Sequence, residues 1–584
     1  MVKGKRHIPS KGRQNLVTFS ILINGERVSR TQHILKLAVH KAVNRIATAI
    51  LQIRDGAVAD QDFAWSSSEL FVPGHEITIR AGYRNQEEVL FQGIIVRHAV
   101  RLWRTGQTVL DITAKDKAAQ MIMGRRNTIF ENMRDSEAFE EIAGRYELGI
   151  ETELSNTVHE QLVQYQSSDW DFLVCRAEAG GMVVINSDNR LVIKRPVMAE
   201  EPVLSLVYGA TIFETEGVID VREQFGEVYA NSWDPATQKP LAIGAEQQPV
   251  IEAGNLPYSD LAEKLGSNDW QLYHSGVLDE PELQSWAEGV QQRSRLAKIR
   301  GQVCCQGTVD VLPGDTVELR GLGDRMNGLA YVSGVQHKLG DGNWLTYLTL
   351  GLENTTHHAL KKDVSAPAAA GLLPSVSGLH TGIVTQLAGD PAGEDRIQIR
   401  LPMISNGENG MWARLATLDA GKDRGTFFLP EIGDEVLVSF LNDDPRQPVI
   451  LGMLHSSAKP APLAASDDNH VKGFISRSGI RLLFNDEDTT LQLDTPQGKK
   501  LVLDENKGAI TLEDEYGNKI AMDSSGIRIE SGKDLMIKAV GDVAVEGLNV
   551  DAKASAALRV TGSISAEISA SGNTVVKGSL VQIN

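Results

Sequence analysis

The sequence predicts a mainly β protein with minor α structure, divided into three regions of different composition. Three observations support this fold class. Short runs of alternating apolar and polar residues, bounded by Gly, Asn and Asp, recur along most of the chain. All eight tryptophans and all three cysteines occur at or before Trp412, so the composition changes abruptly late in the chain. After residue 490, an apolar–any–apolar triplet recurs at a short and nearly regular spacing.

Two stretches rich in Ala, Pro and Ser, without an amphipathic period, are typical of linkers and suggest the region boundaries. The first reads KKDVSAPAAAGLLPSVS and the second begins SSAKPAPLAASDD. The regions and linkers are therefore predicted at 1–360, 361–377 (linker), 378–455, 456–470 (linker) and 471–584.

Charge and hydropathy exclude several functional classes. The formal net charge is −18, and phosphate repels an acidic chain, so binding to nucleic acid or to an anionic membrane is not expected. Mean hydropathy is −0.18, and no apolar run approaches the roughly 20 residues that span a bilayer. Residues 16–23 alternate like a strand and lead into the turn dipeptide Asn24-Gly25, so no signal peptide is predicted. We expect a soluble protein made in the cytoplasm.

The first region is predicted to mix strands with a few helices, as α+β domains do. Apolar residues share one helix face between a cap at Ser168 or Asp169 and a stop at Gly180-Gly181. A second helix is expected from about Pro281 to Arg300, with acidic residues first and basic residues last. Strand pairs are expected at 75–81 with 89–100 and at 182–185 with 191–194.

The middle region is predicted to be a small Greek-key barrel of the OB-fold type, because about five short strands fit into fewer than 80 residues. The strands are expected at 382–387, 395–401, 412–416, 425–429 and 435–442, with 449–454 closing the pattern. OB-folds often bind oligonucleotides, but the stacking aromatics on a basic groove that such binding needs are missing here. A structural barrel is the favoured interpretation, without nucleic acid as a partner.

The last region is a short repeat whose outer apolar residues share one face of each strand. A unit of about eight residues supplies one wall of a prism, whereas a single-chain β-helix needs roughly 20 residues for each coil. Three intertwined chains would supply three walls, so the repeat predicts a triple-stranded β-helix and an obligate homotrimer. The alternative is a disordered low-complexity tail, and the recurring β-branched pairs argue against it.

The chain carries no sequence pattern of a known catalytic or cofactor site. Walker A, Gly-x-Ser-x-Gly and His-Glu-x-x-His sequences are absent. Neighbouring Cys304 and Cys305 should point to opposite sides of a strand as buried thiols, and three cysteines make no disulfide framework. His357-His358 precede a linker and are expected to be solvated. We therefore predict no catalytic residue, no cofactor and no metal, and a protein that is not an enzyme.

Several stretches, in this order, resemble the VgrG family of type VI secretion. They equally resemble the central spike proteins of extracellular contractile injection systems and the hub-and-spike proteins of contractile phage tails. The segment QYQSSDWDFLVCRAEAGG is similar to the family pattern SD-(W/F)-DF-L…RAE…G. The matching segments are Phe71–Gly82, Ala114–Arg125, Gln164–Gly181, Val311–Val335, Leu429–Val436 and Lys472–Asn485.

The resemblance implies a role for each region. Two hub β-barrels in residues 1–360 would form a pseudo-six-fold ring in the trimer and join the inner-tube hexamer and the baseplate proteins. The OB-fold would form the neck, and the prism would be the needle that punctures the target envelope. A PAAR-repeat tip protein would dock at the C-terminus, with effectors as possible cargo. The residues predicted for this docking are Leu580, Val581, Gln582, Ile583 and Asn584.

The resemblance also bears on localisation and on what the chain lacks. Such a protein is made in the bacterial cytoplasm and leaves with the particle, into the extracellular space or the target cell. The chain resembles a bare spike, without a lysozyme-like insert or a module after the prism. No histidine follows His470, so a histidine-bound iron at the tip is not expected. The type of machine, the tip partner and the target cell stay open.

Two other functions remain as alternatives to the spike. A trimeric cell-surface-binding fibre or adhesin should carry aromatic loops near its C-terminus, yet Tyr516 is the last aromatic residue. A β-helix polysaccharide-degrading enzyme should have long coils and a carboxylate or basic cluster in one groove, and the sequence contains neither.

Overall fold

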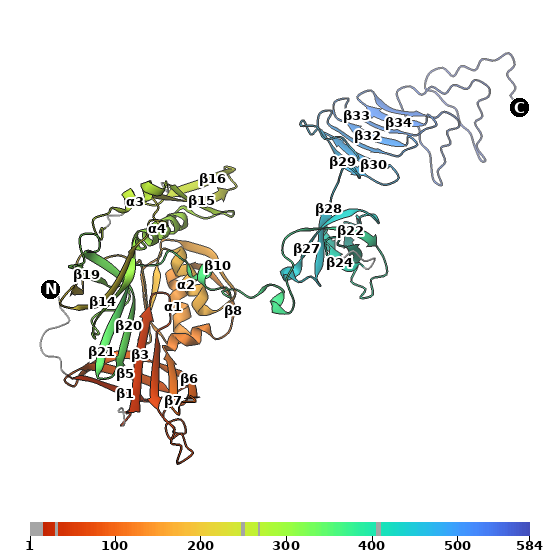
Figure 1. The fold of residues 1–584 in the computed structure, drawn as a ribbon. Helices are drawn as coiled ribbons and strands as arrows, with labels where there is room; N and C mark the ends of the chain where they lie inside the picture. Colours follow the sequence, from red (N-terminus) through yellow and green to blue (C-terminus); the bar gives the residue numbers. More distant parts are fainter. Residues whose placement is uncertain (1–15, 30–32, 247–250, 267–268, 405–409, 584) are drawn as a thin grey trace. The chain divides into compact units, whose positions relative to one another are not determined.

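The computed structural model describes residues 16–29, 33–246, 251–266, 269–404, 410–583 of the chain. It divides into two compact units, the first made mainly of residues up to His380 and the second mainly of residues from Thr381 onward. Each unit is described by itself below, and Figure 1 gives the element labels. The expected mainly β architecture with few helices is confirmed.

A large mixed sheet dominates the first unit. Its path is β14 (Ile212–Ile219), β18 (Ile299–Gln306), β21 (Asn343–Leu350), β20 (Gly328–Gly340), β3 (Ile34–Ala42), β4 (Thr48–Arg54), β7 (Thr108–Lys115), β6 (Gln86–Leu102), β5 (Glu76–Tyr83), β1 (Val17–Ile23) and β2 (Glu26–Arg27). Strand β19 (Thr316–Arg320) pairs with β20 and with β13 (Leu204–Val207). The antiparallel pairing of β20 with β3 joins the early strands to the late ones.

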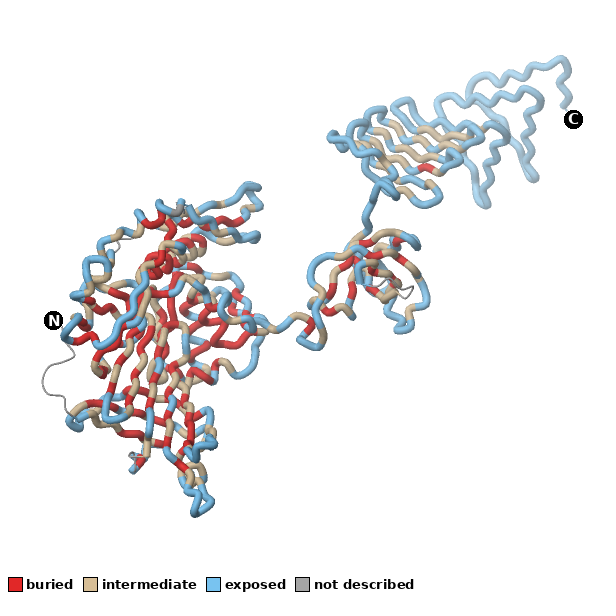
Figure 2. The backbone as a smooth tube through the Cα atoms, in the orientation of Figure 1, coloured by how far each residue is buried: buried red, intermediate tan, exposed pale blue. Residues whose placement is uncertain are grey.

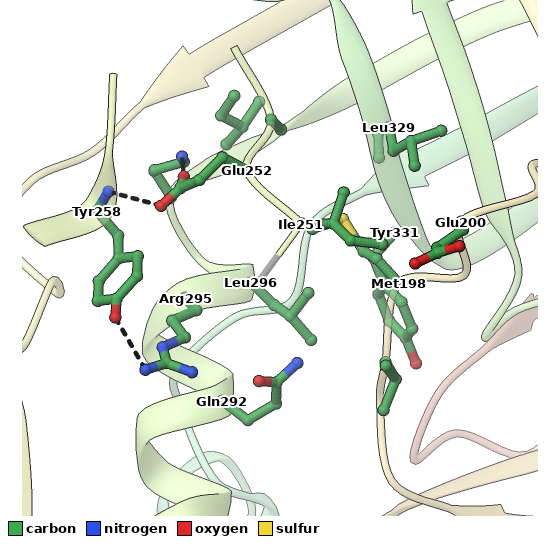
Figure 3. A pocket seen from close by; sticks show the side chains of 16 residues that line it. Met198, Glu200, Ile251, Glu252, Tyr258, Gln292, Arg295, Leu296, Leu329 and Tyr331 are labelled. Atoms are coloured by element: carbon green, nitrogen blue, oxygen red, sulfur yellow. Dashed lines mark hydrogen bonds and ion pairs between the residues drawn. The ribbon is translucent and has the colours of Figure 1, made fainter. Parts of the chain in front are cut away.

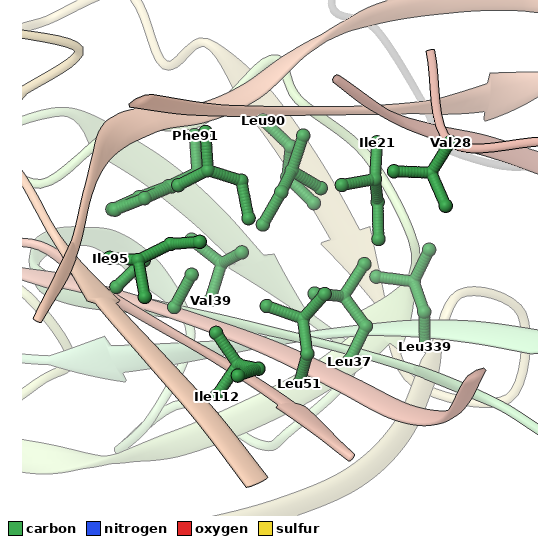
Figure 4. Packing of buried hydrophobic residues seen from close by; sticks show 14 of the residues in the cluster. Ile21, Val28, Leu37, Val39, Leu51, Leu90, Phe91, Ile95, Ile112 and Leu339 are labelled. Carbon is green, nitrogen blue, oxygen red and sulfur yellow. The ribbon is translucent and has the colours of Figure 1, made fainter. Parts of the chain in front are cut away.

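Two hydrophobic cores lie on this sheet. The first gathers side chains from the early strands, including Ile21, Leu37, Leu51 and Phe91, together with Leu339 of β20, as Figure 4 shows. The second belongs to the late strands and includes Val303, Cys305 and Leu348. Cys304 and Cys305 are both buried and free, as predicted for structural thiols.

A helical layer forms a third core. It contains the 3₁₀-helix η2 (Lys117–Ile122), α1 (Asp135–Gly144), α2 (Asp169–Ala179), the ribbon of β8 (Arg126–Arg134) and β10 (Val158–Ser167), and the sheet of β9 (Gly149–Thr152), β12 (Arg190–Lys194) and β11 (Val183–Ser187). The predicted α2 is confirmed: Ser168 caps its first turn by accepting a hydrogen bond from the Asp171 amide, and Gly180 ends it.

A smaller layer surrounds the second predicted helix, α4 (Glu280–Leu296). Asp279 caps α4, Pro281 lies in its first turn, and Arg293 and Arg295 lie in its last turn, so this prediction is also confirmed. The helix ends before Arg300 because β18 begins at Ile299. It packs on the sheet β16 (Lys239–Gly244), β15 (Glu227–Asp234) and β17 (Asp269–His274). The short helices α3 (Tyr258–Leu265), α5 (His357–Leu360) and η3 (Ala368–Gly371) complete this part of the chain.

The five-stranded barrel predicted for the middle region is present and closed. Its order is β22 (His380–Gln386), β23 (Ile397–Arg400), β24 (Met411–Leu415), β28 (Pro448–Met453) and β27 (Glu435–Phe440), with the 3₁₀-helix η4 (Leu441–Asp443) after β27. The prediction of a barrel strand at 425–429 was wrong. The chain forms the hairpin β25 (Ala420–Gly421) and β26 (Arg424–Gly425) instead, and Phe428 leaves the barrel pattern to stack on Phe474 at 5.5 Å.

The C-terminal region forms a seven-stranded antiparallel sheet in which every strand pairs with the next. The strands are β29 (Val471–Ile475), β30 (Arg481–Asn485), β31 (Thr490–Asp494), β32 (Lys500–Asp504), β33 (Ala509–Glu513), β34 (Lys519–Asp523) and β35 (Gly526–Glu530). Residues 531–583, all of which are described, contain neither strand nor helix. The strands expected at the later triplets are therefore absent from a single chain, because a strand needs a hydrogen-bonded neighbour.

None of the helices in the described residues combines the length and the apolar character needed to cross a membrane.

Candidate functional site

Helix α2, which carries the SDWDFL segment, connects the surrounding elements through its acidic and basic side chains. The Asp169 carboxylate is buried and accepts hydrogen bonds of 2.8 Å from the Tyr146 hydroxyl and from the Gln164 amide. It also forms ion pairs with Arg126 at 3.2 Å and with Arg145 at 3.4 Å. One carboxylate thus joins α2 to α1, β8 and β10, and its burial is compensated by four partners.

Arg176 makes a second set of connections from the same helix. Its guanidinium binds both carboxylate oxygens of Asp135, at 2.8 and 3.1 Å, and reaches Glu282 of α4 at 3.0 Å. Burial lowers the pKa of Arg176, but these two carboxylates outweigh it, so the net pKa is raised. A bidentate Arg–carboxylate pair also fixes orientation. Arg176 therefore holds α1, α2 and α4 at fixed positions.

Asp171 binds a chain segment near the end of the first unit. This segment, residues 357–364, is here called the latch. The carboxylate of Asp171 lies 2.8 Å from the ring nitrogen Nε2 of His357 and accepts hydrogen bonds of 2.8 Å from Lys361 Nζ at both oxygens. Ser168 donates a further bond of 2.6 Å. Burial raises the pKa of Asp171, but these hydrogen bonds prevail and lower it to about 2. The carboxylate is therefore charged at neutral pH.

Two more residues hold the latch. Glu178, also on α2, accepts a hydrogen bond of 2.7 Å from the His357 amide. Arg125 donates to the backbone carbonyls of Asp363, at 2.6 Å, and of Val364, at 3.2 Å. The expectation that His357 is solvated was wrong: its side chain is buried against Asp171. The first residues of the predicted linker are thus bound to α2 and to Arg125.

The second unit exposes an unusually apolar face on its C-terminal sheet. The register of β30 to β35 aligns the outer residues of the triplets into two continuous columns. One column is Phe484, Leu491, Leu503, Ile510, Met522 and Ile527, and the other is Leu482, Leu493, Leu501, Leu512, Ile520 and Ile529. Leu512 is 50% exposed and Ile529 55% exposed, and Figure 2 shows how little of this region is buried.

The exposed surface is large for a chain of this mass. The accessible area of the single chain is 36850 Å², whereas a compact monomer of 63.6 kDa exposes roughly 20,000 Å². Apolar side chains of the C-terminal segment, such as Val540, Leu548 and Ile564, are almost fully exposed. An apolar surface of this extent marks an association surface.

The predicted tip-docking residues lie at the end of this exposed segment. Leu580, Val581 and Ile583 are exposed, as is Gln582, on backbone without regular secondary structure. Asn584 lies outside the described residues. The docking role of these residues stays a prediction.

The first unit also contains a cavity of 420 Å³ beside the end of α4, shown in Figure 3. Four of the polar residues that line it bind one another: Glu252 pairs with Lys298 and accepts a 3.1 Å bond from the Tyr258 amide, and Arg295 donates to the Tyr258 hydroxyl at 3.0 Å. Within the described part of the chain, no group of three or more His, Cys, Asp or Glu side chains could hold a metal ion.

Comparison with known families defines the class of protein. Residues 380–455 match the model of the type VI secretion system/phage-baseplate injector OB domain. Residues 490–584 match the phage baseplate V C-terminal trimerisation domain. Two segments of the chain thus match domains of phage-baseplate and type VI secretion injector proteins. Residues 13–341, more than half of the chain, match the Alg8 N-terminal domain, and the chain belongs to that family.

The solved structures that match the chain share little sequence with it. The 43 kDa tail protein of prophage MuSo2 from Shewanella oneidensis is 12% identical, with 58% of this chain and 99% of that chain covered and a TM-score of 0.45. The lidded PdpA–VgrG complex from Francisella is 12% identical, with 89% and 81% covered and a TM-score of 0.38. An E. coli component of the type VI secretion system is 11% identical, with 75% and 99% covered and a TM-score of 0.35. No curated protein sequence matches the chain.

Proposed function

We propose that three copies of this chain form the central spike of a contractile injection system. In this proposal residues 1–360 form the hub, 378–455 the neck and 471–584 the needle. The observation that carries the proposal is the pair of apolar columns on the C-terminal sheet, which one chain leaves open to water. The match of this segment to a trimerisation domain supports three as the number of chains.

Trimer formation would bury the apolar columns of the C-terminal region and would give residues 531–583 hydrogen-bond partners. Three sheets with their apolar columns turned inward make a closed prism, and the hydrophobic effect favours it because large apolar side chains leave water. Residues 531–583 lack strand neighbours within the chain, so their backbone groups would pair with the other two chains. At a formal charge of −18 per chain, mutual repulsion between the finished particles keeps them soluble.

The contacts of Asp171 and Arg125 with the latch suit a segment that transmits mechanical force from the hub. We place the inner-tube hexamer and the baseplate proteins at the hub, with puncture of the target envelope as the task of the needle. Force from the tube would enter at the hub and leave through the chain after residue 356. Asp171 and Arg125 bind that segment at both side-chain and backbone atoms, so the connection is reinforced where it leaves the hub.

The far end of the needle is the proposed seat of a PAAR-repeat tip protein, with effector cargo travelling on the tip or elsewhere. The docking residues are those predicted from the sequence, Leu580 to Asn584. Deletion of Gly578–Asn584 should abolish co-purification of a PAAR-type protein and leave the oligomeric mass unchanged. Retained co-purification would refute the assignment of this end.

The spike as a whole is tested by electron microscopy of the purified full chain. The proposal predicts a three-fold particle with a wide hub and one thin needle. Labelling with a gold probe on an added C-terminal tag should mark the free end of the needle. Particles without three-fold symmetry, or a label on the wide end, would contradict the proposal. The particle is expected outside the producing cell once the machine has been released.

A further inference from the structure

The C-terminal sheet carries a column of charged side chains that alternate in sign at every step. Each of six strands, β30 to β35, contributes one residue, alternately the first and the last of its strand. Because the strands are antiparallel, these residues lie along one edge of the sheet, and consecutive members are directly opposite each other. This column, here called the charge ladder, is Arg481, Asp494, Lys500, Glu513, Lys519 and Glu530. The column at the other end of the strands has no such alternation: Asn485, Thr490, Asp504, Ala509, Asp523 and Gly526.

Two of the five opposite pairs in the ladder form ion pairs. Arg481 lies 2.7 Å from the carboxylate of Asp494, whose side chain is buried, and Lys519 lies 3.9 Å from Glu513. Burial raises the pKa of Asp494, but hydrogen bonds and the charges of Arg481 and Lys500 lower it overall. Opposite charges directly across a sheet stabilise the pairing, and like charges destabilise it.

The apolar columns alone do not fix the strand register. In β32 and β33, Leu501 faces Leu512 and Leu503 faces Ile510. A slip of two residues keeps every side chain on its own face and sets Leu501 opposite Ile510, so an apolar pair survives. The same slip moves Lys500 from Glu513 to a position opposite Thr511. It also sets Leu503 opposite Gly508, so the slipped register loses one of the two apolar pairs together with the charge pair.

We propose that the charge ladder fixes the register of β30 to β35 within each chain. Between β30 and β31, β31 and β32, and β34 and β35, a slip of two residues in either direction breaks the opposite-charge pair. Between β32 and β33, and between β33 and β34, the slip that sets the lysine opposite Thr511 breaks it. The ladder ends at Glu530, which is also where the strands of the single chain end. It thus covers the part of the needle in which strands pair with their own chain. This role does not depend on trimer formation.

The register can be read directly from disulfide trapping in the full chain. Cysteines at Val502 and Thr511 lie opposite each other in the native register, whereas cysteines at Val502 and Ala509 do so only after a slip of two residues. Each charge variant is made in both double-cysteine proteins. Oxidation followed by peptide mass analysis then gives the yield of the native bond in the first and of the slipped bond in the second. The reversal Lys500→Glu places like charges against Asp494 and Glu513. Lys533→Glu, which lies beyond the ladder and makes the same change in net charge, is the matched control.

The proposal predicts that Lys500→Glu raises the slipped bond and lowers the native bond at least severalfold, while Lys533→Glu changes neither. Reversal of all six ladder charges restores the alternation and should restore the native bond. Equal yields in Lys500→Glu and Lys533→Glu would overturn the proposal, because the turns alone would then fix the register. A slipped bond that persists after the six-fold reversal would overturn it too. The bonds form in monomer and trimer alike, so a failed trimer does not affect this test.

Discussion

Asp171 illustrates how a single buried carboxylate determines where a chain segment goes. An isolated buried charge would cost several kcal/mol, so it persists only with partners. Asp171 has a lysine, a histidine and a hydroxyl as partners, and two of these belong to the latch. The acidic residues of the SDWDFL segment therefore act through the contacts they make with distant parts of the chain.

The latch yields the first prediction. Asp171→Asn leaves Lys361 without its counter-charge and should destabilise the hub by about 3 kcal/mol. Amide exchange of residues 357–364 should become faster, as measured by hydrogen–deuterium exchange. Asp60→Asn, an exposed change of the same kind, is the control and should have no effect. Unchanged exchange in Asp171→Asn would mean that Glu178 and Arg125 hold the latch without Asp171.

His337 predicts a pH dependence of hub stability. It is buried on β20 with Nδ1 3.0 Å from Thr346 Oγ1. Burial, with a smaller effect from the charge of Lys41, lowers its pKa to about 3. The unfolded histidine binds a proton below about 6.5, so between these values the unfolded state holds more protons and acid favours unfolding. This residue should cost about 1.4 kcal/mol of hub stability for each pH unit below 6.5.

Urea unfolding of the wild type and of His337→Gln at pH 7, 6 and 5 checks this sign. The variant is expected to lose less stability between pH 6 and pH 5 than the wild type. Parallel losses in the two proteins would show that other groups cause the acid sensitivity.

Helices α2 and α4 approach each other closely at two glycines. A Cβ on Gly289, inside α4, would lie 2.6 Å from the Cα of Gly181, just beyond the end of α2. Glycine within a helix costs roughly 0.5–1 kcal/mol relative to alanine. The close contact explains why glycine is nevertheless found here, and it lets α2 and α4 share the Arg176–Glu282 ion pair.

Gly289→Ala should therefore destabilise the hub although alanine is the better helix former. We expect a loss of about 1–3 kcal/mol from overpacking, measured by urea unfolding. Gly144→Ala, at the end of α1, is the matched control, because nothing lies within 4 Å of its new Cβ. That control should be neutral or slightly stabilising. A stabilised Gly289→Ala protein would mean that the two helices can move apart.

The elements that local signals specify could be predicted from the sequence, and those that depend on distant partners could not. Helix α2 was predictable because its cap, its apolar face and its terminating glycine are close together in the chain. The burial of His357 was not, since its partner Asp171 is 186 positions away. The strand expected at 425–429 is also absent, and there Phe428 stacks on Phe474, a residue far away in the sequence.

At the scale of the whole molecule, the main feature is the large apolar surface that a single chain leaves exposed to water. The apolar columns were predictable from the triplets, and their register was not, because it also depends on the turns and the charge ladder. The exposed area exceeds that expected of a compact chain by more than half. A monomer with such a surface would aggregate, so the account requires self-association.

The native mass in solution, measured by light scattering behind a sizing column, tests this requirement most directly. Three chains of 63.6 kDa give about 191 kDa, and the account predicts a single species of that mass over a wide concentration range, because an interlocked trimer does not dissociate readily. A well-behaved monomer at 63.6 kDa would contradict it, since the apolar columns would then have no partner chain.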